Sequence, residues 1–255
     1  WINIPGSPKL QSLSFHSPMK NDKVALGLKA QFMGYGATKS SSVYAMYAYH
    51  LRIGNGKLSL GLQGGVDISN TDYSGIQSTL THPDDIVFTT TDQPYVLPNI
   101  GAGAYYFNEK FYLGLSVPAF LSYKKASSGS LQAYHSVNEY DFIASAGALI
   151  TFSPVFKFKP SVLIDYSLQK TKKLSQLDIN GNFIIADLLW IGGSYRTSEK
   201  VAVGILQILP TPQMMIGFSY DYPVGLSNIT SGGSVEFILR YEFGSRVSAA
   251  NPRYF

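Results

Sequence analysis

The clearest alternation in the chain is in Lys57–Ser69, which has the sequence KLSLGLQGGVDIS. Its apolar side chains fall on every second position, and these are Leu58, Leu60, Leu62, Val66 and Ile68, with Gly64 in the same row. The positions between them hold small or polar residues, which are Ser59, Gly61, Gln63, Gly65 and Asp67. Successive side chains of a β-strand point to opposite faces, so this period of two predicts a strand with one apolar and one polar face.

The same alternation continues along the chain on both sides of this stretch. Near the end, Val235 and Phe237 alternate with Ser234 and Glu236. Residues rich in Asn, Gly, Asp and Pro separate the alternating segments, as tight hairpins require. The pattern predicts strands at residues 10–18, 23–35, 41–53, 57–72, 95–108, 110–122, 140–153, 156–169, 175–186, 188–197, 200–209, 213–223 and 234–243.

Strand length and composition favour a lipid environment for the apolar faces. Most of the expected strands run about 9–13 residues, near the ~9–11 that cross a bilayer at a tilt and longer than the soluble average of ~5–6. Charged residues make up 14% of the chain, against roughly 25% in soluble domains. The sequence therefore predicts an all-β fold, an antiparallel transmembrane β-barrel. A soluble sheet with its apolar face inward is the alternative that alternation alone leaves open.

Aromatic residues mark the ends of the expected apolar rows. A barrel in a membrane carries girdles of aromatic side chains at the two lipid–water interfaces. The candidates for such a girdle are Tyr220, Tyr222, Tyr241 and Phe243.

The expected connections alternate between short turns and longer loops. This asymmetry is typical of outer-membrane barrels, whose long loops lie outside, so residues 81–92 and 127–136 are expected to be extracellular. About thirteen strands are visible, whereas bacterial single-chain barrels have an even number. We therefore expect about fourteen in the intact protein, with the first strand missing before Trp1. Residues 1–243 then form the barrel and residues 244–255 a periplasmic C-terminal tail.

Charged residues on the polar rows are expected to face the interior. A Lys or Arg turned toward lipid at mid-depth costs about 2–4 kcal/mol, so the interior is the favourable direction. Two arrangements of these charged residues are open from the sequence. In one they line a pore, and in the other they form ion-pair networks that fill the interior. The candidates are Asp67, Lys157, Lys159, Asp165, Asp178, Glu236 and Arg240.

The sequence gives no basis for a catalytic, cofactor-binding or metal-binding assignment. There is no cysteine, and the four histidines, His16, His50, His82 and His135, are too scattered for paired-ligand spacing. No Lys/Arg run of the kind that follows a phosphate backbone is present, which argues against nucleic-acid binding. We expect a protein that is not an enzyme and needs no cofactor.

Several stretches resemble one family of outer-membrane proteins. The run PNIGAGAYYFNEKFYLGLSVP at residues 98–118 is similar to the central signature of the PorP/SprF family. Residues 8–18, 56–66, 176–183, 216–222 and 251–255 resemble further family segments in the same order. The family usually has an additional N-terminal segment and strand before the position of Trp1.

The resemblance implies a role in the type IX secretion and gliding machinery of Bacteroidetes-like bacteria. Its implied partners are the C-terminal domains of secreted adhesins, components of the translocon and periplasm, and outer-membrane lipid. The implied location is the cell outer membrane. The alternative function on the same fold is a passive outer-membrane channel or a solute or lipid transporter.

Overall fold

The structure is a computed structural model that describes residues 6–19, 22–72, 94–125, 131–169, 174–224 and 233–243. The predicted outer loop at residues 81–92, the tail at residues 244–255 and part of the predicted loop at residues 127–136 lie outside these ranges. The described residues include no helix with the length and apolar character of a membrane span.

Strands make up nearly all of the described chain. They are β1 (Lys9–Pro18), β2 (Val24–Tyr35), β3 (Thr38–Ile53), β4 (Gly56–Thr71), β5 (Tyr95–Phe107), β6 (Phe111–Val117), β7 (Ser122–Lys125), β8 (Leu131–Tyr134), β9 (Asp141–Ala148), β10 (Ile150–Thr151), β11 (Phe156–Ser167), β12 (Leu174–Ile185), β13 (Leu189–Arg196), β14 (Val201–Thr211), β15 (Met214–Pro223) and β16 (Ser234–Tyr241).

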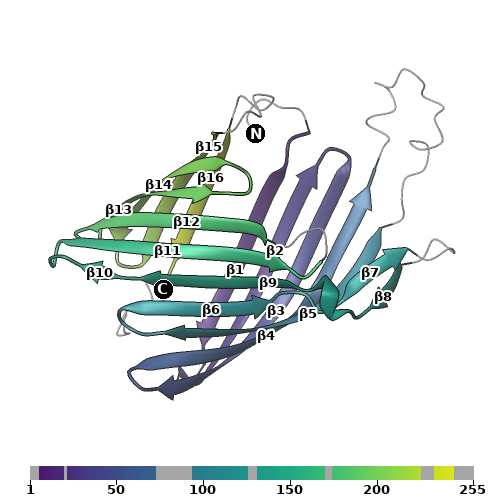
Figure 1. The fold of residues 1–255 in the computed structure, drawn as a ribbon, viewed down its shortest axis with the longest axis horizontal. Helices are drawn as coiled ribbons and strands as arrows, with labels where there is room; N and C mark the ends of the chain where they lie inside the picture. The colour runs from purple at the N-terminus through teal and green to yellow at the C-terminus, as the bar shows by residue number, and fades with distance from the viewer. Residues whose placement is uncertain are drawn as a thin grey trace.

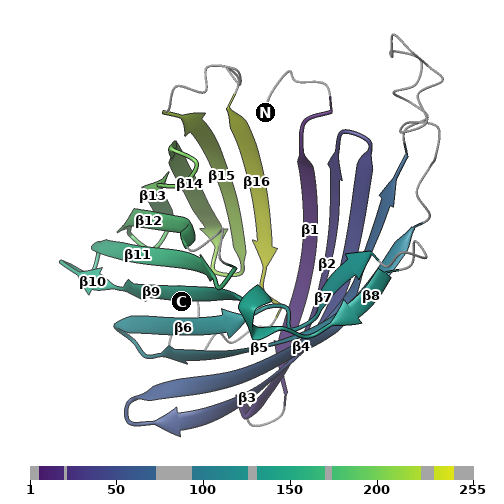
Figure 2. The same cartoon turned by 45° about the vertical axis from the view of Figure 1, so that its right-hand side comes forward.

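One large antiparallel sheet contains all of these strands except two. Thirteen strands follow one another in chain order, β10 pairs only with β11, and β7 and β8 form a separate two-stranded sheet. Figures 1 and 2 show the large sheet curving round until its first and last strands, β1 and β16, lie side by side. The predicted all-β antiparallel fold with about thirteen visible strands is confirmed.

The sheet turns an apolar face outward. Five side chains pair in one continuous row across β12 to β16, and they are Phe183, Ile191, Leu206, Phe218 and Phe237. Their exposed fractions lie between 42% and 70%. The next residue on each strand points the other way, and on that face Ile184 and Trp190 are buried. This is the reverse of a water-soluble sheet, where the apolar face is covered.

The inner face is filled in part by side chains at one end. Ile184, Trp190, Leu209 and Met215 form a buried apolar group, and Leu149 packs against it. These residues lie beside the short connections between β12 and β13 and between β14 and β15. We call them the inner apolar cluster. It occupies interior space between β12 and β15 near the short-turn end of the sheet.

The two edge strands run in the same direction. Twelve successive pairings join the thirteen strands from β1 to β16, and every one is antiparallel. A direct β1–β16 pairing would therefore be parallel. One more strand between them, running opposite to both, gives an even and fully antiparallel ring. We propose that such a strand lies there.

Cross-linking of the full-length protein in its membrane tests this proposal. Neighbouring strands are ~4.8 Å apart, so an intervening strand separates β1 from β16 by about 10 Å, beyond the ~7 Å limit for a disulfide. Cysteine pairs between residues 10–17 and 235–240 are expected to resist oxidation to a disulfide but to react with a long bis-maleimide. Disulfide formation in any pair would show direct closure. A pair across β2 and β3, Leu28→Cys with Ala45→Cys, is the positive control because these residues are opposite each other.

Candidate functional site

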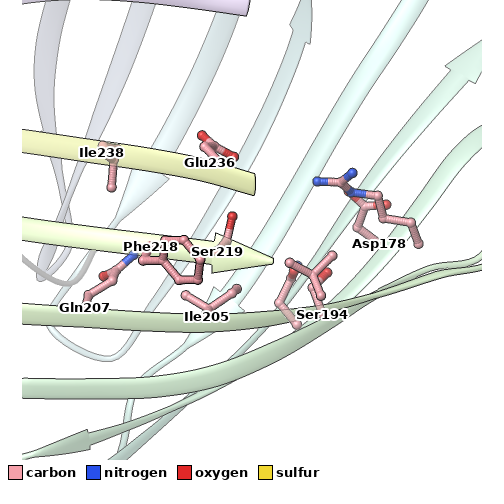
Figure 3. Close-up of a pocket in the computed structure, with 11 residues that line it drawn as sticks. Asp178, Ser194, Ile205, Gln207, Phe218, Ser219, Glu236 and Ile238 are labelled. Atoms are coloured by element: carbon pink, nitrogen blue, oxygen red, sulfur yellow. The ribbon is translucent and has the colours of Figure 1, made fainter. Parts of the chain in front are cut away.

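The interior face of the sheet carries the polar and charged groups. A pocket on this face takes its lining from β12 to β16 (Figure 3). Its polar residues include Asp178, Asn180, Arg196, Gln207, Ser219 and Glu236. Among the described residues, no group of three or more His, Asp or Glu side chains is arranged to hold a metal ion.

An ion pair bridges two strands beside this pocket. Arg196 on β13 donates to the Asp221 carboxylate on β15 at 2.7 Å, across the intervening strand β14. Glu199 lies 3.7 Å from the same guanidinium. The Arg196 and Asp221 side chains are only 30% and 17% exposed, so removing either one would leave the other as a largely buried charge without its partner. The pair links β13 to β15 at the end of the sheet opposite the short β12–β13 connection.

Two of the predicted interior residues lie near that pair. Asp178 accepts two hydrogen bonds from the Gln176 amide, at 2.9 and 2.8 Å. Glu236 lines the same pocket from β16, next to Ser219 in the strand register. The strand pairing places Asp165 on β11 opposite Gln176.

The predicted interior lysines lie at the short-turn end. Lys157 donates to both carboxylate oxygens of Asp187, at 2.7 and 2.8 Å. Lys159 lies over two aromatic rings, with its ammonium nitrogen 5.7 Å from the ring centres of both Tyr112 and Trp190. Cations at this distance from ring faces are attracted by the ring quadrupole. Lys159 thus contacts the inner apolar cluster at the ring of Trp190.

Asp67 and Arg240 belong to two further local groups. Asp67 accepts a 2.5 Å hydrogen bond from the Tyr44 hydroxyl on β3. The Arg240 guanidinium lies 3.4 Å from Glu242, two residues further along the chain. The seven predicted residues are therefore distributed over separate local groups around the wall. The partners Tyr44, Asp187 and Arg196 were missed by sequence reasoning, since only the register between strands shows which polar rows meet.

Tyr44 lies over a glycine that leaves room for it. A Cβ atom at Gly65 would overlap the Val43 backbone oxygen and lie 2.7 Å from the Tyr44 ring. The ring can therefore lie over β4 and reach Asp67 only because position 65 has no side chain.

Replacing Gly65 with alanine is expected to displace Tyr44 and break its bond to Asp67. A loss of about 1–3 kcal/mol in unfolding free energy is expected, because overpacking is added to an unmade hydrogen bond. Gly64→Ala is the matched control on the same strand: its Cβ would meet only Ile100, at 3.8 Å. Denaturant titration of both variants in detergent micelles measures the difference. Equal losses of unfolding free energy in the two variants would contradict the requirement for a glycine at position 65.

The predicted girdle residues are exposed at two opposite ends of the sheet. Tyr220 and Tyr222 lie at the end of β15 from which the longer connection to β16 leaves. Tyr241 and Phe243 lie at the opposite end, with ring centres 4.9 Å apart. Their exposed fractions are 36%, 61%, 51% and 81% in order of residue number. A role as a girdle remains a prediction.

The connection between β6 and β9 lies against the inner wall and was expected to be a loop. It contains the hairpin β7–β8 and the short 3-10 helix η2 (Val137–Glu139). Tyr123 in β7 donates a hydrogen bond to the Pro98 carbonyl on β5. Burial, and then the nearby Asp67 carboxylate, raise the pKa of Tyr123 above its ordinary value. The phenol therefore stays protonated as a donor.

The fold and the interior face together define a class of protein. An antiparallel sheet that curves round, exposes its apolar rows and carries the ion pairs Lys157–Asp187 and Arg196–Asp221 on the opposite face has the organisation of a membrane β-barrel. The chain belongs to the PorP/SprF family: the model of the type IX secretion system membrane protein PorP/SprF matches residues 1–241. A comparison with curated protein sequences finds no match. The resemblance seen in the sequence is thereby confirmed.

Proposed function

We propose that this protein is a non-enzymatic outer-membrane component of the type IX secretion and gliding machinery. It assists the export or surface anchoring of secreted adhesins through their C-terminal domains, and it contacts the translocon or its periplasmic partners. The observation that carries the proposal is the family match over residues 1–241. The outward apolar rows support a position in lipid, where such side chains are stable.

The contents of the interior favour a protein-handling role over a passive channel. The inner apolar cluster fills space between β12 and β15. Arg196, Lys157 and Asp221 are engaged in close ion pairs on the inner wall. Charges that line a water-filled pore are more useful when they face the permeating solute than when they pair with each other.

Deletion of the gene in the source bacterium, followed by complementation, tests the proposal. Adhesins that carry the type IX C-terminal domain are expected to disappear from the cell surface and to return with the wild-type gene. Outer-membrane proteins outside this pathway serve as the control. In parallel, the protein purified from native membranes in mild detergent is expected to bring translocon components with it. Normal adhesin display in the deletion strain would refute the role in secretion.

The passive-channel alternative has its own test. The purified protein is placed in planar bilayers and its conductance is recorded at neutral pH. The secretion proposal expects no steady open-channel current. A stable current in every inserted molecule would favour the channel instead.

A further inference from the structure

The wall of the sheet is incomplete on one side of β5. β5 has 13 residues, whereas β6 has only 7. The two strands pair from Phe107 and Tyr112 up to Ala102 and Val117. Within the described residues, Tyr95–Gly101 therefore extend beyond the last β6 pair, and β9 pairs with β6 only as far as Ile143. Beyond these last pairs, β6 no longer separates β5 from β9 within the described residues.

A four-residue segment lies along the part of β5 that β6 leaves unpaired, with the Pro118 carbonyl over the inner face of β5 at Gly101. It comprises Pro118–Leu121, which follow β6 directly and are not part of a strand; we call it the gate segment. Pro118 has no backbone N–H and cannot extend the ladder as a donor. One backbone hydrogen bond joins the segment to β5, from Phe120 N–H to the Ile100 carbonyl at 2.9 Å.

The side chain of Asn99 makes three further hydrogen bonds to the segment. Asn99 is 8% exposed, and its Oδ1 accepts the backbone N–H groups of both Phe120 and Leu121 at 3.1 Å. Its Nδ2 donates to the Leu121 carbonyl at 3.0 Å. One amide thus replaces several backbone partners that a longer β6 would have supplied.

Two residues on the wall position the same segment. Gln63 on β4 donates from Nε2 to the Pro118 carbonyl at 2.8 Å. Gly101 leaves room for that carbonyl, since a Cβ there would overlap the Pro118 oxygen. The attachment therefore rests on two side-chain amides and one absent side chain, together with the Phe120 ring, whose centre lies 5.3 Å from that of the Tyr140 ring, and the Tyr123 hydrogen bond to the Pro98 carbonyl just after the segment. The pairs below it, from Ala102 to Phe107, have ordinary strand pairing.

We propose that the gate segment is a movable closure of the wall and that Asn99 is its latch. Release of the Asn99 bonds lets Pro118–Leu121 move away from β5 and opens the edge of β5 at Asn99–Gly101. The β5–β6 pairs below Gly101 remain intact, because they do not depend on Asn99. Local opening of this kind occurs where few interactions hold a segment while the surrounding strands stay folded. The proposal is independent of the secretion role.

Thiol labelling tests the latch directly. The chain has no cysteine, so Ala119→Cys introduces a single probe into the gate segment. Its reaction with a bulky maleimide is measured in micelles of the full-length protein, with and without Asn99→Ala. Labelling is expected to be at least about tenfold faster in the double variant, since each lost hydrogen bond changes an opening equilibrium by roughly fivefold.

Two further variants keep the test decisive. Gly101→Ala pushes on the Pro118 carbonyl without touching Asn99, and it is expected to accelerate labelling as well. Asn99→Asp keeps the acceptor but sets a carboxylate against the Leu121 carbonyl, and it is expected to give an intermediate rate. Asn70→Ala, an exposed asparagine on β4, is the matched control and is expected to label within about twofold of the parent.

Heat-dependent gel mobility of each variant shows that the sheet remains folded. Faster labelling of the Asn99 and Gly101 variants with unchanged mobility supports the gate. Labelling of Asn99→Ala at the control rate would overturn it, because the segment would then be a fixed part of the wall. If Asn99→Ala does not fold, Gly101→Ala and Asn99→Asp decide in the same way.

Discussion

Arginine in place of Leu28 is expected to lower the unfolding free energy of the protein in lipid vesicles by about 2–4 kcal/mol. Leu28 lies near the middle of β2 and is 52% exposed on the outward face. It pairs with Phe15 on one side and Ala45 on the other. A guanidinium at this position is either transferred from water into hydrocarbon or extends along the barrel surface to the lipid–water interface. Both arrangements cost free energy.

The control for this variant is on the same strand. Gln31→Arg places the same charge on the opposite face, where Lys29 already lies. It is expected to change stability by less than about 1 kcal/mol, because an interior charge keeps access to water and polar partners. Urea titration of both variants in vesicles gives the comparison. Equal destabilisation by the two substitutions would contradict the assignment of the two faces.

Truncation of Trp190 to alanine is the second change with a large expected effect. Trp190 is 7% exposed within the inner apolar cluster, beside Ile184, Leu209 and Met215. Removing a buried tryptophan side chain typically costs about 3–5 kcal/mol, because the transfer free energy of the removed atoms is lost and a cavity is left behind.

A phenylalanine variant separates packing from a general effect of substitution. Trp190→Phe keeps an aromatic ring near Lys159. Its loss in unfolding free energy is therefore expected to be less than half of the loss in Trp190→Ala. Planar-bilayer recordings add a second measurement, in which Trp190→Ala is expected to conduct ions more readily than Trp190→Phe. Indistinguishable stability and conductance of the two variants would show that the cluster does not fill the interior.

The strands were predictable because alternation is a property of each segment by itself. The expected strand at 57–72 corresponds to β4 (Gly56–Thr71), and the one at 213–223 to β15 (Met214–Pro223). A period of two needs no knowledge of the neighbouring strand, since it follows from the geometry of one chain. The direction of each face followed from composition, because a chain with few charged residues cannot cover an apolar sheet in water.

The connection after β6 shows where this reasoning fails. Residues 110–122 were expected to form one strand, yet β6 ends at Val117 and Pro118 begins the gate segment. The sequence does contain the signal, since proline supplies no donor to the ladder. The hairpin β7–β8 had no such signal, because its strands have only four residues each. Segments this short carry too little periodicity to identify.

The interior contacts were harder still to predict. Arg196 meets Asp221 because β13, β14 and β15 pair in one particular register. A shift of one residue in either pairing would send one of the two charges to the outer face. Register is set by many contacts between distant segments, so a single sequence could identify the polar row but not the partner within it.

The period-two arrangement also bears on the chain before its strands pair. Leucines and phenylalanines that end up in one oily belt are separated along the chain by Ser, Gly and Gln, and mean hydropathy is only +0.04. No stretch of this sequence therefore approaches the ~20 consecutive apolar residues of a membrane-spanning helix. The continuous apolar surface forms only when the strands pair, so the unpaired chain presents no extended apolar segment.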